Sequence, residues 1–231
     1  MIPISDANPS SNSPVITRII ILICIFIYLF IQPNDNSSLN AFYYQYAAIP
    51  CELVRFSPIT EAQYYFANCL QDNSPIIFKN KSIMASIFIS PLLHSSFLHI
   101  LGNLWSLWIF GDNVEDKFGK FRIIYFIIFS SVISILGHVI LNPSSTIPIV
   151  GISGVVAAVM GAYYYLFPNA RILVLVPFGF IFPTTIKAKT FMIFWIFSQL
   201  LLTLQNTNIS WEAHLVGFVI GYSLTRLFVK K

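Results

Sequence analysis

Six apolar runs, separated by more polar segments, dominate the hydropathy pattern of the chain. The runs cover residues 19–31, 97–111, 121–141, 153–167, 188–204 and 213–229. A helix needs about 20 mainly apolar residues to span a bilayer, and most of the runs approach or reach that length. Two runs of about 15 residues would extend only ~22 Å as helices, so their ends should lie below the membrane surface. The pattern predicts an all-α, polytopic membrane protein built as a bundle of six transmembrane helices.

The segments outside the runs predict the domain organisation. Residues 1–14 are rich in Ser, Asn and Pro and are expected to form a flexible cytoplasmic tail. Residues 15–231 should form the membrane domain, with one long, aromatic-rich extracytoplasmic loop at about 32–82. The apolar stretch 172–183 is interrupted by Pro and Gly, so we expect it to lie at the membrane interface. A cleaved signal peptide is a weaker interpretation of run 19–31, because no suitable cleavage site follows it.

The composition excludes an ordinary water-soluble domain. Of the 231 residues, 56% are hydrophobic and only 10% are charged, against roughly 25% charged residues in soluble domains. A net charge of +4 is, by itself, compatible with nucleic acid as a partner. The basic residues are scattered in short clusters between apolar runs, and they form no continuous face. We therefore expect the lipid bilayer, and no nucleic acid, as the surrounding partner.

The placement of Lys and Arg predicts the orientation in the membrane. With six spans, ten of the 13 Lys and Arg residues fall on one side, and the other three, Arg55, Lys79 and Lys81, fall on the opposite side. Cytoplasmic segments of membrane proteins carry the excess of positive charge. We therefore expect a multi-pass protein with both termini in the cytoplasm, located in a bacterial cytoplasmic membrane.

A few polar side chains lie at the predicted outer ends of three helices that run in the same direction. Polar groups inside a membrane are costly, so such residues are functional candidates. His99 and Asn103 are four residues apart and share one helix face, where both can donate hydrogen bonds to one oxygen. Ser153 begins a helix, where unpaired backbone N–H groups favour a developing oxyanion. His214 begins another helix and is the histidine best placed to act as a base for Ser153.

No acidic residue completes a triad with Ser153 and His214. Glu212 is two residues from His214 and points to a different helix face. The residues therefore predict a Ser–His dyad, with Ser153 as nucleophile and His214 as general base and then general acid.

Small residues should bring the helices of Ser153 and His214 close together. Gly154 follows the serine, and Gly217 and Gly221 follow the histidine at spacings of three and seven residues. Small residues at such spacings let membrane helices approach closely. These glycines could serve packing alone, but close packing would also bring a short serine side chain within reach of an imidazole.

Other catalytic classes lack the residues that they require. The chain has no His-Glu-x-x-His segment, and His94 and His99 are poorly spaced on one helix for a shared metal. An aspartyl intramembrane protease would need two acidic residues at membrane depth. Asp112 and Asp116 lie on the predicted cytoplasmic side, without a partner on a second helix. We therefore expect neither a metal nor a cofactor.

Three segments occur in a fixed order along the chain: His94-x4-His99-x3-Asn103, Gly151-x-Ser153-Gly154 and Ala213-His214-x-x-Gly217-x-x-x-Gly221. Together with residues 111–122, they resemble the signature segments of the rhomboid intramembrane serine proteases. The resemblance covers about residues 90–221 and includes the number of helices.

The resemblance implies a catalytic role for each of these segments. Ser153 would be the nucleophile and His214 the base, and the oxyanion would be bound by His99, Asn103 and the backbone N–H of Ser153. The implied substrates are transmembrane segments of other membrane proteins, cleaved near the outer face. Some family members carry an aromatic residue four positions after the serine, stacked on the catalytic histidine. This chain has Ala157 there, which leaves open how the ring of His214 is held.

Two other functions remain as alternatives. A transporter or channel would place polar groups near the bilayer midplane and show repeat symmetry, and neither is visible. An inactive rhomboid-like protein that binds membrane helices would be expected to lack the serine or the histidine.

The remaining polar and aromatic candidates have simpler interpretations. His94 and His138 are expected to be loop or interface residues, although His94 could support the oxyanion region. Gln199 and Trp195 are expected to pack or to lie at the interface. Cys51 and Cys69 share the long loop, and they could be a disulfide or two free thiols.

Overall fold

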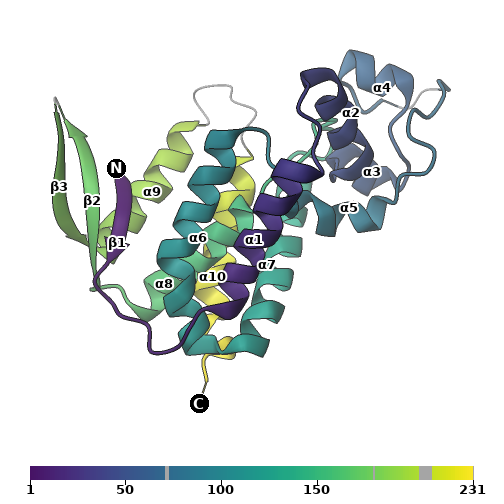
Figure 1. Ribbon diagram of the computed structural model, residues 1–231. Coiled ribbons are helices and arrows are strands. Elements are labelled where there is room, and N and C mark those ends of the chain that lie inside the picture. The colour runs from purple at the N-terminus through teal and green to yellow at the C-terminus, as the bar shows by residue number, and fades with distance from the viewer. Residues whose placement is uncertain (71–72, 179, 203–209, 231) are drawn as a thin grey trace.

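The computed structural model describes residues 1–70, 73–178, 180–202 and 210–230 as a mainly helical protein (Figure 1). The long helices are α1 (Val15–Phe30), α6 (Phe97–Phe118), α7 (Lys120–Leu141), α8 (Ser153–Leu166), α9 (Ala188–Leu202) and α10 (Trp211–Phe228). Each coincides with one of the six predicted apolar runs. The last two residues of the predicted run 188–204 lie outside the described residues. The helices form a bundle (Figure 1) with a large apolar core, in which several polar side chains are also buried.

Among the described residues, helix length and apolarity identify few full membrane spans. Helix α7 is long and apolar enough to cross a bilayer. A second span results if α6 and the bent segment Ile83–Leu92 before it, which meet at 79°, are taken together. The apolar helices α1, α8 and α9 are shorter. The six apolar helices are therefore present, whereas six spans are not shown by length and composition.

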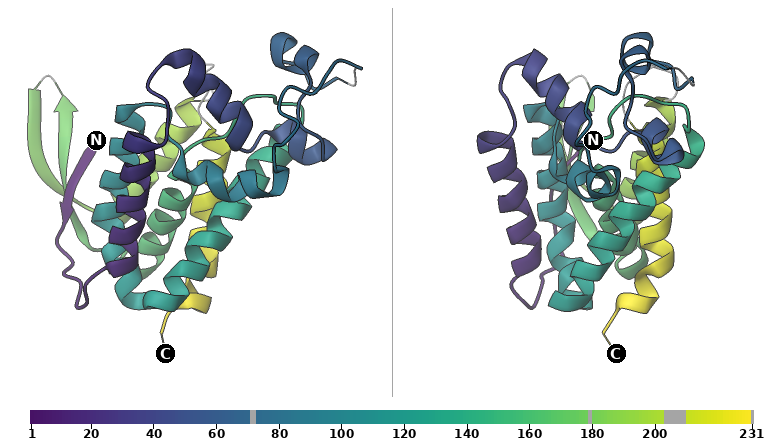
Figure 2. Two further views of the ribbon diagram at one scale, coloured as in Figure 1. Left: turned by 45° about the vertical axis from the view of Figure 1, so that its right-hand side comes forward. Right: turned by 90° about the vertical axis from the view of Figure 1, so that its right-hand side faces the viewer.

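A small subdomain at one end of the bundle contains the long loop predicted between the first two runs. It covers residues 32–82 and contains α2 (Asn36–Tyr46), α3 (Pro50–Arg55) and α4 (Glu61–Phe66); α5 (Ile83–Ile89) and the 3₁₀-helix η1 (Ser90–Leu92) follow it and lead into α6. Both views in Figure 2 place these short helices at the end opposite the C-terminus. The segment that the sequence predicts as a long loop is thus folded into short helices.

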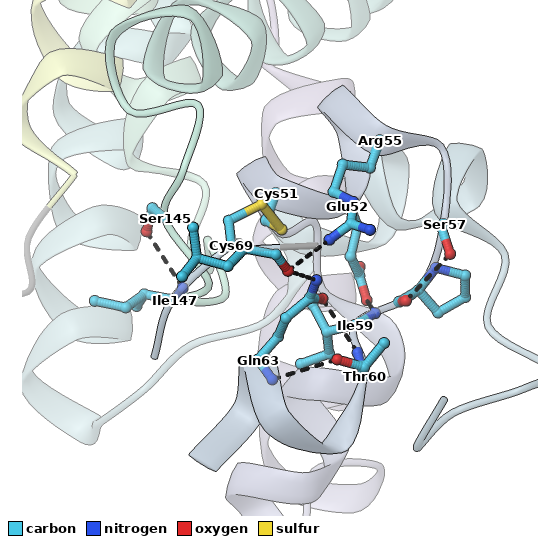
Figure 3. Close-up of a disulfide and its surroundings, with 12 residues drawn as sticks. Cys51, Glu52, Arg55, Ser57, Ile59, Thr60, Gln63, Cys69, Ser145 and Ile147 are labelled. Carbon is cyan, nitrogen blue, oxygen red and sulfur yellow. Dashed lines mark hydrogen bonds between the residues drawn. A yellow bond between two sulfur atoms is a disulfide. The ribbon is translucent and has the colours of Figure 1, made fainter. Parts of the chain in front are cut away.

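A disulfide and a buried ion pair stabilise this subdomain. Cys51 and Cys69 form a disulfide, which settles the alternative left open by the sequence (Figure 3). Next to it, Lys81 Nζ lies 2.5 Å from Glu52 Oε2, and both side chains are fully buried. Burial raises the pKa of Glu52 and lowers the pKa of Lys81, because each charge has lost its hydration.

A three-stranded antiparallel sheet corrects the prediction that residues 1–14 form a flexible tail. Strand β1 (Ile2–Asp6) pairs with β2 (Arg171–Phe178), which pairs with β3 (Phe180–Lys187). Residues 2–6 are thus ordered as a strand, and the described residues of the stretch 172–183, expected at the membrane interface, belong to the strands β2 and β3 beside α9 (Figure 1). Pairing supplies backbone hydrogen bonds that neither segment could make alone. The fold is therefore mainly, but not purely, α-helical.

Helices α8 and α10 pack against each other more extensively than the other helix pairs. A Cβ at Gly221 would lie 1.9 Å from the carbonyl oxygen of Ala158, and one at Gly217 would lie 2.3 Å from that of Gly154. Backbone therefore touches backbone along this contact, and only glycine fits there. The contact sets the distance between the helices that carry Ser153 and His214.

Candidate active site

Ser153 and His214 meet across the contact between α8 and α10. Ser153 is the first residue of α8, and His214 lies in the first turn of α10. The Ser153 Oγ is 2.7 Å from the Nε2 of His214. The first N–H groups of α8 have no partner within the helix, so the helix presents donors beside the serine. This geometry is that of a nucleophile in contact with its base.

The second nitrogen of the His214 ring contacts a residue whose role the sequence analysis missed. The Nδ1 of His214 is 2.7 Å from the Oε1 of Gln199 on α9, and Gln199 is buried. The ring of Trp195, one turn earlier on α9, lies 6.3 Å from the imidazole. The sequence predicts only packing or interfacial roles for Gln199 and Trp195, because the sequence does not show which group an amide in an apolar helix contacts.

His99 and Asn103 lie on α6, beside the segment that precedes Ser153. The backbone N–H of His99 donates to the N-cap Ser96 side chain, which positions the first turn of α6. Gly151 has φ of +112°, and a Cβ there would lie 2.7 Å from the His99 ring and 3.5 Å from the Asn103 Nδ2. Glycine at 151 therefore permits both the turn and the close approach of the α6 side chains.

Asn103 carries an N–H group that is buried and unsatisfied. In the part of the chain that the structure describes, its Nδ2 is out of contact with water and has no hydrogen-bond partner. Buried polar groups are nearly always paired, so an unpaired donor needs an explanation. A donor of this kind is free to bind an oxygen of a bound molecule.

His94 supports the His99 ring from behind. The two rings pack edge to face with their centroids 5.3 Å apart. Burial lowers the pKa of His94 to about 3, so its ring is neutral at pH 7. The backbone of His94 is held by Gln32, which binds both its N–H and its carbonyl oxygen at 2.8 Å, and by the hydroxyl of Tyr43 at 2.7 Å. The sequence does not predict these roles of Gln32 and Tyr43, because their contacts with His94 join segments that are far apart in the sequence.

A cavity of about 740 Å³ joins these groups. Its lining includes Ser153, His214, His99, Asn103 and Gln199, with apolar side chains between them. A volume of this size accommodates a peptide segment, and the mixture of apolar walls with a few polar groups is typical of ligand sites. The predicted site residues Ser153, His214, His99 and Asn103 therefore line one cavity.

Glu212 and His138 form a separate contact. The Glu212 Oε2 is 3.1 Å from His138 Nδ1, and its Oε1 accepts from Asn142 Nδ2 at 3.1 Å. Glu212 therefore ties the start of α10 to the end of α7 and does not bind His214 Nδ1. In the described ranges, no group of three or more His, Cys, Asp or Glu side chains is arranged to hold a metal ion.

Comparison with known proteins identifies the family of the chain. Residues 81–231, more than half of the chain, match the Rhomboid domain family. The chain belongs to the rhomboid family of membrane-embedded proteins. It is 30% identical over 142 residues to the protein named "Putative rhomboid protease YdcA" of Bacillus subtilis (strain 168). That match covers 61% of this chain and 65% of YdcA, which is less than two thirds of the relative.

Proposed function

We propose that the protein is an intramembrane serine endopeptidase that hydrolyses peptide bonds in or beside transmembrane segments of other proteins. The contact of 2.7 Å between Ser153 Oγ and His214 Nε2 carries this proposal. Membership of the rhomboid family supports the same class of reaction. A transporter has no need for a serine hydroxyl bound to an imidazole nitrogen at the wall of a cavity.

The mechanism uses the dyad in two steps. Ser153 Oγ attacks the carbonyl carbon of the scissile bond while His214 Nε2 takes the hydroxyl proton. When the tetrahedral intermediate collapses, the carbon–nitrogen bond breaks and the same proton passes from His214 to the leaving amine. Water then repeats the sequence on the acyl-enzyme, which releases the second product and restores the serine.

The oxyanion is stabilised by donors from two helices. His99 and the unpaired Nδ2 of Asn103 supply side-chain donors from α6, and the backbone N–H of Ser153 supplies one from α8. Donors that are already in place need no reorganisation during the reaction, and removal of one typically costs about 10²–10³ in rate. Buried, neutral His94 holds His99 in position for this role.

The topology belongs to the proposal as well. Helices α1, α6, α7, α8, α9 and α10 cross a bacterial cytoplasmic membrane, with the start of α1 and the C-terminus on the cytoplasmic side. The distribution of Lys and Arg supports this orientation. Strand β1, in contrast to the cytoplasmic tail that the sequence predicts, lies along α6, where Trp105 Nε1 donates to the carbonyl oxygen of Pro3. The disulfide Cys51–Cys69 agrees with an extracytoplasmic subdomain, because disulfides persist in oxidising compartments.

Labelling with a fluorophosphonate probe tests the nucleophile. Purified wild-type protein should be labelled, whereas Ser153→Ala and His214→Ala should not. Ser131 lines the same cavity, so Ser131→Ala is the matched control and should label as the wild type does. Equal labelling of wild type and Ser153→Ala would exclude Ser153 as the nucleophile. Cleavage of a single-span membrane substrate by Ser153→Ala would exclude the mechanism.

A further inference from the structure

Both ring nitrogens of His214 are engaged, each by a different helix. Nε2 contacts Ser153 on α8, and Nδ1 contacts the Oε1 of Gln199 on α9, each at 2.7 Å. Gln199 is 7% exposed, so solvent does not compete strongly for its amide. The orientation of this amide decides which nitrogen of the ring carries the proton.

A neighbouring hydroxyl fixes the orientation of the Gln199 amide. Ser198 Oγ donates its one hydrogen to the carbonyl oxygen of Trp195, at 2.6 Å. Towards Gln199 the hydroxyl can therefore only accept, and the group that contacts it at 3.2 Å must be the amide nitrogen. The amide oxygen of Gln199 is consequently the atom that faces His214.

The amide oxygen in turn fixes the tautomer of the imidazole. Because Oε1 of Gln199 accepts and cannot donate, Nδ1 of the ring must carry the hydrogen. Nε2 then has a free lone pair and accepts the hydroxyl hydrogen of Ser153. This is the tautomer that a general base needs, and the opposite tautomer would leave Ser153 without a base.

We infer that Gln199 is the positioning residue for His214, so that the site operates as a Ser153–His214–Gln199 triad, and this inference rests on the proposed function. The amide replaces the carboxylate of a triad and holds the ring without adding a charge to an apolar environment. When His214 takes the proton from Ser153, the Nδ1–H remains bound to Gln199, so the imidazolium keeps its orientation.

The contact with Gln199 also explains how the His214 ring is held in a chain that has Ala157 four residues after Ser153. The side chain of Ala157 is a single methyl group, which offers no aromatic face to the imidazole. Helix α9 supplies the restraint instead, through the Gln199 amide at Nδ1 and the ring of Trp195, which also stacks on Phe218 of α10. His214 on α10 is therefore hydrogen-bonded to both neighbouring helices, to α8 through Ser153 and to α9 through Gln199.

Two substitutions of equal length separate positioning from packing. Gln199→Met fills the same space but cannot accept from Nδ1–H, whereas Gln199→Glu keeps an acceptor oxygen. We expect Gln199→Met to lower kcat for a single-span substrate, and the rate of fluorophosphonate labelling, by about 10–100-fold with little change in KM. Gln199→Glu should remain within about tenfold of the wild type. Phe197→Ala, an exposed neighbour on α9, is the control and should have no effect on kcat.

Nitrogen-15 NMR of labelled His214 gives a readout that packing alone would not change. Wild-type protein should show a protonated Nδ1 and an unprotonated Nε2, and Gln199→Met should show a mixture of the two tautomers. Equal kcat for wild type and Gln199→Met, with Ser153→Ala inactive, would overturn the role of Gln199 and leave the proposed function standing. Labelling of Ser153→Ala at the wild-type rate would instead overturn the proposed function itself. A kcat loss of equal size in Gln199→Met and Gln199→Glu would also overturn the inference.

Discussion

The helix bundle and the subdomain at residues 32–82 are stabilised in different ways. Along α8 and α10 the bundle depends on shape, because backbone lies against backbone at Gly217 and Gly221. The subdomain has few residues in its apolar clusters and depends instead on a disulfide, a buried ion pair and helix caps. The bundle thus fixes positions through contacts that tolerate no added atom, and the subdomain fixes them through specific bonds.

Buried polar groups are treated differently in the two regions. In the subdomain, Glu52 and Lys81 are paired with each other, and Lys81 also donates to the carbonyl oxygen of Tyr44. At the wall of the cavity in the bundle, by contrast, the Nδ2 of Asn103 lacks a partner among the described residues. An unsatisfied buried donor costs stability, so its place at the cavity indicates a site shaped for a bound molecule.

The largest effect is expected from one added methyl group between α8 and α10. In Gly221→Ala, the new Cβ would lie within 2.6 Å of three backbone atoms of Ala158. Backbone cannot move aside as a side chain can, so the helices must separate, and Ser153 and His214 must lose contact. We expect loss of both fluorophosphonate labelling and cooperative thermal unfolding.

A second glycine provides the control for this substitution. Gly102 also lies in a helix of the bundle, but a Cβ there would meet nothing within 4 Å. Gly102→Ala should retain labelling and gain slight stability from its better helix propensity. Wild-type labelling by Gly221→Ala would show that shape does not govern the α8–α10 contact.

The second largest effect should come from breaking the ion pair in the subdomain. Lys81→Met leaves the Glu52 carboxylate buried without its cation, and loss of one partner of a buried pair typically costs about 3–5 kcal/mol. The change should appear as faster hydrogen exchange and proteolysis in residues 32–82. Labelling of Ser153 should decline far less than in Gly221→Ala.

The double variant Glu52→Leu with Lys81→Met tests the cause of that loss. Replacement of both charges by apolar groups removes the uncompensated carboxylate, and such replacements are often close to neutral. The double variant should therefore recover most of the protection. If it is no more stable than Lys81→Met, the pair contributes through packing and not through charge.

The sequence predicts the bundle well because apolar side chains avoid water, either in the protein core or in lipid. The six apolar runs became helices, and Ser153 and His214 could be chosen because they are polar groups at the starts of apolar helices. The spacing of Gly217 and Gly221 also indicated the close contact with α8. These features are local or periodic, so one segment is enough to reveal them.

The features that the sequence did not predict depend on pairs of distant segments. Strand β1 exists because Ile2–Asp6 pairs with residues about 170 positions later, and a short segment with one Pro carries no strong strand signal. Gln199 and Gln32 are ordinary amides in apolar surroundings until the fold places them at His214 and His94. Propensity and periodicity contain no information about such contacts.

Loss of the disulfide should cost less than loss of Lys81 alone, and its effect should be confined to the subdomain. It closes a loop of 18 residues, for which chain entropy gives about 3 kcal/mol. We expect Cys51→Ser with Cys69→Ser to lower the protection of residues 32–82 and to leave labelling of Ser153 nearly unchanged. Cys24→Ser, at a buried position of α1, is the contrasting substitution, and it should affect the bundle instead. A similar fall in labelling for both would show that the two regions are not independent.

The smallest effects are expected from the loss of two helix caps, one in the bundle and one in the subdomain. They compare the two regions most directly, because the two caps make the same kind of bond. Ser96 caps α6 by accepting from the N–H of His99 at 3.2 Å, and Thr60 caps α4 by accepting from that of Gln63 at 3.3 Å (Figure 3 shows the latter). Loss of either cap should cost about 1 kcal/mol. Only Ser96 holds a turn that carries an oxyanion donor, so Ser96→Ala should lower kcat several-fold at unchanged KM, and Thr60→Ala should not. Equal kcat in the two variants would mean that the first turn of α6 is positioned by His94 and Gly151 alone.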